Sequence, residues 1–155
     1  MGQIARVSFS IEPFREGVFA IRPAVNGTPL TDMISSFERD QDFKPAGTYG
    51  GLIPQWANYG PLDRYFLGDF GQKSYFVRMG AVYLLGCQCG EVGCWPLTAR
   101  ISASSESVTW DSFRQPHRPD RDYSMFGPFV FEVTKYRDAV AALCAEYFVR
   151  VPHLD

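Results

Sequence analysis

The clearest hydrophobic pattern lies near the N-terminus, where apolar and polar side chains alternate over residues 5–11. A period of two is typical of a β-strand with one face in the core and one in solvent. A turn rich in proline and glycine follows at 12–17, and the apolar positions of 18–25 indicate a second strand. The pattern therefore predicts an N-terminal hairpin of strands near 5–11 and 18–25.

Two segments show a helical period. In the first, Thr28 is expected to be the N-cap and Pro29 the first helical residue, because the missing N–H of proline costs nothing there. The apolar residues that follow recur at i, i+3, i+4 and i+7: Leu30, Met33, Ile34 and Phe37. Near the C-terminus, Thr134 is expected to cap a second helix with an apolar face formed by Tyr136, Val140, Leu143, Cys144, Tyr147 and Phe148. Its place on this face predicts that Cys144 is a buried, unreactive thiol.

The C-terminal half predicts a three-strand meander, with strands near 80–87, 95–103 and 107–112 and a further short strand at 129–133. Strands and helices do not alternate as in βαβ units. The predicted fold class is therefore α+β, with an antiparallel sheet and two helices packed on one face. The sheet would combine the N-terminal hairpin with the C-terminal three-strand meander. A length of 155 residues fits a single domain over 1–155.

Residues 41–73 break every period, because glycines and prolines recur through them. Aromatic residues are scattered through the same stretch, among them Tyr49, Trp56, Tyr59, Tyr65, Phe66 and Phe70. A loop of this length and aromatic content is expected to pack on the body of the domain rather than to link two domains.

Composition excludes several classes of protein. Apolar residues make up 46% of the chain and charged residues 21%, which is typical of a folded globular protein. The net charge of -2 argues against a nucleic-acid partner. No apolar run is long enough to span a bilayer, and the first residues contain no apolar signal core. We therefore expect a cytoplasmic protein with reduced thiols and no membrane partner.

The strongest chemical signal is a glycine-rich hairpin that contains Cys87, Cys89 and Cys94. Thiolates bind zinc in a tetrahedron, and tight glycine turns present such ligands, so the hairpin is a candidate zinc site. A fourth ligand would have to be His117, which is the best placed, or Cys144 or His153.

Other interpretations of the hairpin stay open. In one, the thiols are small hydrophobic residues that only pack, and in another, Cys87 and Cys94 take part in thiol–disulfide exchange. A thiol-dependent enzyme would use Cys94 with His117, and Asp111 would then orient the imidazole. Because the third strand of a meander returns to the level of the first turn, residues 111–117 are expected near the three cysteines.

Three motifs resemble those of a family of small bacterial proteins of unknown function. They are C-x-C-G-x-x-G-C-W-P-L at 87–97, W-x-x-F-x-Q-P-H-R at 110–118 and G-P-F-V-F at 127–131. The resemblance covers roughly residues 80–145. It implies a bacterial, cytoplasmic, stand-alone domain, and it implies no activity and no catalytic residue.

The sequence leaves three functions open. The first is a non-enzymatic binding or accessory protein, because we find no acid–base pair, cofactor loop or convincing nucleophile, and many aromatic residues suit a protein partner. The apolar loop 123–129 is a candidate surface for such a partner, or a loop folded onto the core. The second function is a zinc-stabilised domain, and the third is a small thiol-dependent enzyme.

Overall fold

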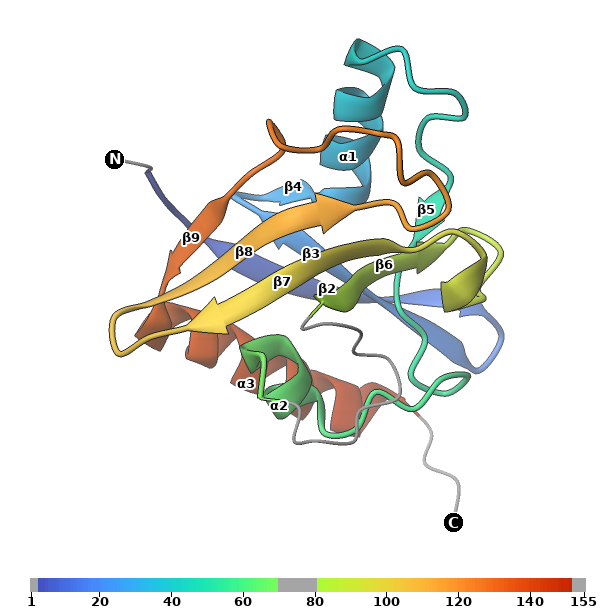
Figure 1. Cartoon of the computed structure of the whole chain (residues 1–155). Helices are drawn as coiled ribbons and strands as arrows, with labels where there is room; N and C mark the ends of the chain where they lie inside the picture. Colours follow the sequence, from blue (N-terminus) through green and yellow to red (C-terminus); the bar gives the residue numbers. More distant parts are fainter. Residues whose placement is uncertain (1–2, 70–80, 152–155) are drawn as a thin grey trace.

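The computed structural model describes residues 3–69 and 81–151 (Figure 1). The strands in these ranges are β1 (Ile4–Ala5), β2 (Val7–Arg15), β3 (Val18–Val25), β4 (Thr28–Pro29), β5 (Tyr49–Gly50), β6 (Ala81–Cys87), β7 (Leu97–Ala103), β8 (Ser107–Arg114) and β9 (Phe129–Glu132). The helices are α1 (Leu30–Asp40), α2 (Leu62–Leu67), the short 3₁₀ helix η2 (Val92–Cys94) and α3 (Val133–Arg150).

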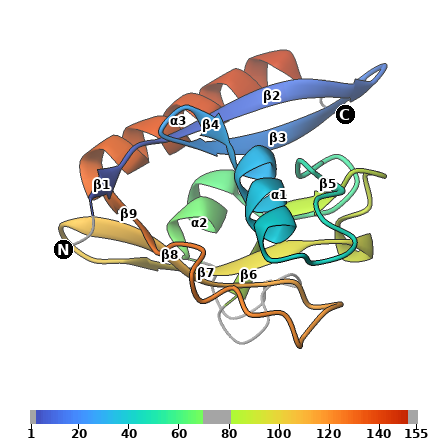
Figure 2. The same cartoon turned by 90° about the horizontal axis from the view of Figure 1, so that it is seen from above.

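The strands form two sheets, so the prediction of one antiparallel sheet is wrong. The larger sheet has the order β1-β9-β8-β7-β6-β5, and the smaller has the order β2-β3-β4. The larger sheet is mixed, because β1 pairs with β9 in parallel while its other pairs are antiparallel. Figure 2 shows the smaller sheet with α3 along one side of the molecule and the β6–β8 meander along the opposite side.

The N-terminal segment changes partners at Arg6. The Arg6 N–H donates to the Asn26 side-chain oxygen at 2.8 Å, and its carbonyl accepts from the Asn26 N–H at 2.8 Å. Residues before this point pair with β9, and residues after it pair with β3. The alternation over 5–11 is continuous across the switch, so the sequence pattern predicted one strand where the chain contributes to two sheets.

The two local predictions within those sheets are confirmed. β2 and β3 form an antiparallel hairpin. β6, β7 and β8 form an antiparallel meander, with one register shift in each pair. Both units consist of strands adjacent in sequence, which is why alternation and turn signals were sufficient to predict them.

The helices depart from the prediction of two helices on one face. α1 lies above the strands in Figure 1, whereas α3 and the unpredicted α2 lie below them. Thr28 and Pro29 pair with β3 as β4, and no side chain caps α1. The carboxylate of Glu132, rather than Thr134, caps α3 by accepting a hydrogen bond from the Lys135 N–H at 2.8 Å. No helix within 3–69 or 81–151 is long and apolar enough to cross a membrane.

The described part of the aromatic segment, 41–69, packs on the body as predicted. It forms β5, which pairs with the end of β6 and places Tyr49 beside Cys87. Leu52 then exchanges two backbone hydrogen bonds with Ile21 of β3, at 2.7 and 2.9 Å. This segment therefore connects the two sheets at the end of the molecule that carries the cysteine hairpin. Residues 70–73 of the predicted loop lie outside the described residues.

Candidate metal centre

The cysteine hairpin is built from the end of β6, a tight turn and η2. The turn closes with a hydrogen bond from the Gly90 N–H to the Cys87 carbonyl at 2.9 Å, and η2 closes with one from the Cys94 N–H to the Glu91 carbonyl at 3.1 Å. Gly90 adopts φ +100°, a conformation that side chains other than glycine rarely adopt. These contacts fold the segment back so that Cys94 returns to the end of β6.

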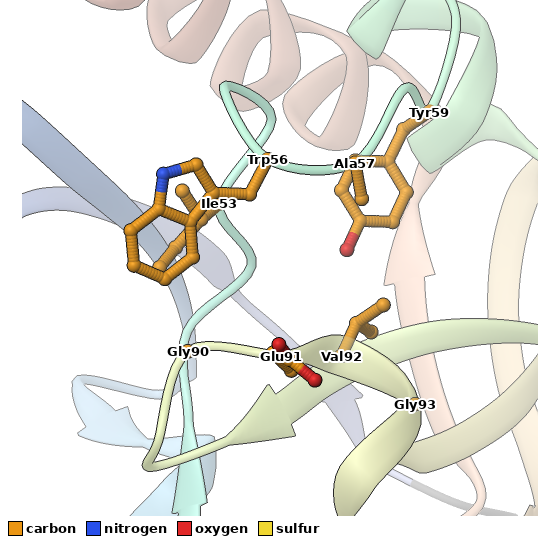
Figure 3. A pocket seen from close by; sticks show the side chains of 8 residues that line it. All are labelled: Ile53, Trp56, Ala57, Tyr59, Gly90, Glu91, Val92 and Gly93. Carbon is orange, nitrogen blue, oxygen red and sulfur yellow. The ribbon is translucent and has the colours of Figure 1, made fainter.

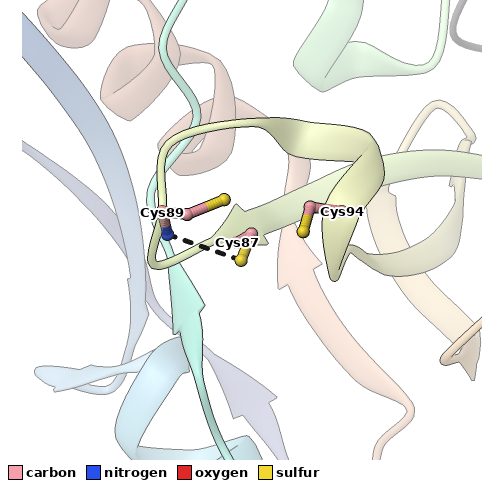
Figure 4. A group of neighbouring side chains, drawn as sticks. All are labelled: Cys87, Cys89 and Cys94. Atoms are coloured by element: carbon pink, nitrogen blue, oxygen red, sulfur yellow. Dashed lines mark hydrogen bonds between the residues drawn. The ribbon is translucent and has the colours of Figure 1, made fainter.

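The fold brings the three cysteine sulfurs into one group. Their Sγ atoms all lie within 4.8 Å of one another. Cys87 is buried, whereas Cys89 and Cys94 are exposed. Figure 4 shows the three side chains gathered inside the hairpin, where the Cys89 N–H donates to the Cys87 sulfur at 3.4 Å. The arrangement can hold a metal ion, which makes these residues a candidate metal centre.

The thiols differ in their electrostatic surroundings. Burial raises the pKa of Cys87 to about 11. The Glu91 backbone N–H, with a further hydrogen bond from Cys87, lowers the pKa of Cys89. Cys89 therefore carries negative charge more readily than Cys87, and an ion bound to all three sulfurs would have to displace the proton of Cys87.

His117 lies beside the hairpin, as the connectivity of the meander predicts. Its Nε2 is 2.7 Å from the carbonyl oxygen of Gly93, the residue before Cys94. A carbonyl oxygen only accepts hydrogen bonds, so Nε2 carries a proton in this contact. His117 does not belong to the group of metal-binding side chains found in the described residues, which consists of the three cysteines. His117 therefore holds the loop before Cys94 through Nε2 and lies outside that group.

Trp95 fixes the far side of the hairpin. Its indole N–H donates to the Gly47 carbonyl at 2.9 Å, and the His117 ring stacks on it with an interplanar angle of 10°. The Arg118 guanidinium lies 5.0 Å from the centre of a Trp95 ring, which is a cation–π contact. The loop after β8 is thereby packed against the residue that follows Cys94.

A buried carboxylate, which sequence reasoning missed, secures the same end of the molecule. Glu38 of α1 is 0% exposed and forms an ion pair with Arg121 at 3.2 Å. It also accepts hydrogen bonds from the hydroxyls of Tyr123 at 2.5 Å and Tyr49 at 2.7 Å, and from the Gly47 N–H at 2.8 Å.

Burial raises the pKa of Tyr123 to about 12 although Arg121 opposes the shift, so this hydroxyl keeps its proton at neutral pH. One signal for the role of Glu38 was present in the sequence. Glu38 lies four residues after Ile34 and eight after Leu30, on the apolar face of the predicted helix.

A cavity lies against the hairpin on the side of the aromatic segment (Figure 3). Its volume is about 330 Å³, and it is lined by Ile53, Trp56, Ala57, Tyr59 and the hairpin residues 90–93. Gly90 permits this packing, because a Cβ there would lie 2.4 Å from the Trp56 ring. The cavity and the cysteines therefore share the short connection between Cys89 and Cys94.

Other predicted site residues lie elsewhere. Asp111 lies opposite Arg100 in the backbone register of β7 and β8, and its carboxylate accepts a hydrogen bond from Ser112 rather than from His117. Cys144 is half-buried against the core rather than fully buried, and burial raises its pKa. His153 lies outside the described residues.

The loop 123–129, a candidate partner surface in the sequence, is mostly folded onto the body. Tyr123 and Phe126 are buried, and both pack against Phe37 of α1. Met125 is 82% exposed. The interpretation as a loop packed on the core therefore fits most of this segment.

No family model matches the chain, and neither the curated proteins nor the solved structures include a match. The resemblance to a family of small bacterial proteins therefore stays a prediction. The same holds for the bacterial cytoplasm that the resemblance implies.

Proposed function

We propose that this chain is a non-enzymatic accessory domain that binds a thiophilic metal ion, such as Zn²⁺, through Cys87, Cys89 and Cys94. The observation that carries the proposal is the convergence of three Sγ atoms within 4.8 Å in one glycine-rich hairpin. Two hydrogen-bonded turns and a tether from His117 hold the hairpin in this shape.

The separation of the sulfurs is close to that of a metal-bound set. Zn–S bonds of about 2.3 Å place tetrahedral sulfur ligands about 3.8 Å apart. The thiols would therefore approach one another by at most about 1 Å, which removal of the thiol protons and the attraction of a cation favour. Cys89 and Cys94 are exposed, so an ion has a direct path from solvent.

Thiol–disulfide exchange is a second candidate, favoured by the same proximity. Any two of these sulfurs would have to close to about 2.05 Å, with Cβ atoms in the narrow geometry of a disulfide. Metal binding requires a smaller movement of the hairpin and uses all three sulfurs, so it explains more of the arrangement.

Titration of the reduced protein with Co²⁺ tests the proposal, because thiolate ligands give this ion intense charge-transfer absorption. We expect one ion per chain, displaced by Zn²⁺. Substituting Cys87, Cys89 or Cys94 by Ser should remove the absorption band, whereas C144S is the matched control and should retain it. A band that persists in C89S, or no band in the folded wild-type protein, would reject the proposal.

A further inference from the structure

The donor set of the candidate metal centre consists of sulfur alone. Within the described ranges, the group that can hold an ion comprises Cys87, Cys89 and Cys94 and includes no histidine or carboxylate. The Nε2–H of His117 donates to the Gly93 carbonyl at 2.7 Å. The other ring nitrogen, Nδ1, keeps its lone pair but lies outside the group of side-chain atoms that could share an ion.

The number of ligands and their soft, polarisable sulfur atoms indicate which metal ion the group suits. Structural zinc sites are almost always tetrahedral and take four protein ligands. Monovalent copper is a softer ion that selects thiolates, and three of them in a plane complete its coordination. We infer that the ion carried by this hairpin is monovalent copper rather than zinc, an inference that rests on the proposed metal-binding function.

The exposure of the ligands supports a site that passes its ion on. One ligand, Cys87, is buried at the end of β6, while Cys89 and Cys94 are open to solvent. An incoming thiolate from a partner can bind the ion as one of the exposed sulfurs leaves. This exchange changes neither the number of sulfur ligands nor the oxidation state of the ion. A site built only for stability would gain from a shielded ion.

The test uses the reduced, full-length chain under anaerobic conditions. Cu⁺ is supplied from a chromophoric copper chelator and Zn²⁺, in parallel, from a zinc indicator, and X-ray absorption then counts the atoms bound to each ion. C144S is the control for unrelated thiol binding. H117A and H153A test whether either imidazole completes the site, including His153 beyond the described residues.

We expect one Cu⁺ per chain with three sulfur neighbours, unchanged in H117A and H153A. Zn²⁺ should bind more weakly than about micromolar and take a solvent ligand. A Zn²⁺ site with a nitrogen neighbour that is lost in H117A or H153A would overturn the copper inference and leave the metal-binding function standing. Copper bound with fewer than three sulfurs would also overturn it. If neither ion binds, the proposed function itself fails.

Discussion

His117 tethers the loop before Cys94 through a 2.7 Å hydrogen bond from its Nε2 to the Gly93 carbonyl. The imidazole also stacks on Trp95, which is fixed in turn to Gly47. The third thiol of the candidate metal centre is thus positioned by a loop from the far end of β8. His117 is therefore a positioning residue of the hairpin in the proposed metal-binding function.

His117→Ala should weaken metal binding without changing its stoichiometry. A single net hydrogen bond contributes about 0.5–1.5 kcal/mol, so the loss of the tether should lower affinity by at most about tenfold. Arg118→Ala removes the neighbouring cation–π contact and is the control. Isothermal titration of both variants measures the effect. Complete loss of binding in His117→Ala alone would mean that the imidazole is a ligand.

Two glycines of the hairpin should differ in how strongly replacement by alanine destabilises the domain. Gly90 has φ +100° and its Cβ would meet the Trp56 ring at 2.4 Å, whereas a Cβ on Gly93 would meet nothing within 4 Å. Gly90→Ala should therefore lower the free energy of unfolding by about 1–3 kcal/mol, from backbone strain and overpacking. Gly93→Ala should change it by less than about 0.5 kcal/mol. Urea unfolding of both proteins checks the difference, and equal effects would contradict the packing of Trp56 on the hairpin.

In the metal-free protein, Cys89 should be alkylated faster than Cys87. It is exposed, and the Glu91 backbone N–H lowers its pKa, so more thiolate is present at neutral pH than in a free cysteine. Cys87 is buried with a pKa of about 11 and should react slowly until the pH approaches that value. Iodoacetamide labelling from pH 6 to pH 10, read by peptide mass spectrometry, gives the order. Faster labelling of Cys87 than of Cys89 would contradict the described hairpin.

Glu38→Gln should destabilise the domain strongly. The substitution leaves Arg121 without its buried partner, and breaking such a pair typically costs about 3–5 kcal/mol. The exposed pair of Glu12 and Arg22 is the matched control, because Glu12→Gln should cost less than about 1 kcal/mol. Chemical unfolding measures both. If Glu38→Gln lowers the free energy of unfolding by no more than Glu12→Gln does, the buried network contributes little to stability.

Local patterns predicted the parts of this fold that are local in sequence. Alternation was sufficient for the β2–β3 hairpin and the β6–β8 meander, because their partners are adjacent along the chain. The parallel pairing of Ile4 and Ala5 with β9 joins residues more than a hundred positions apart. A strand of two residues is too short to show an alternating pattern, so the sequence did not indicate that β1 pairs with β9.

The candidate metal centre was partly predictable for the same reason. Three cysteines within eight residues and their glycines identified the hairpin, and the connectivity of the meander placed His117 beside it. Spacing did not predict whether His117 would point to the thiols or to a backbone carbonyl. The role of Glu38 depends on Arg121 and Tyr123, which lie over 80 residues further along the chain. The spacing of apolar and polar residues along a short segment does not identify polar partners this far apart in the chain.

The most direct test of the metal-binding account is native mass spectrometry of the reduced protein after anaerobic incubation with equimolar Cu⁺ and removal of unbound ion. The account predicts a mass increase of one ion in the wild-type chain and in C144S. It predicts no increase when Cys87, Cys89 and Cys94 are together replaced by serine in a chain that still folds. An ion retained by that triple variant, or a folded wild-type chain that retains none, would contradict the account.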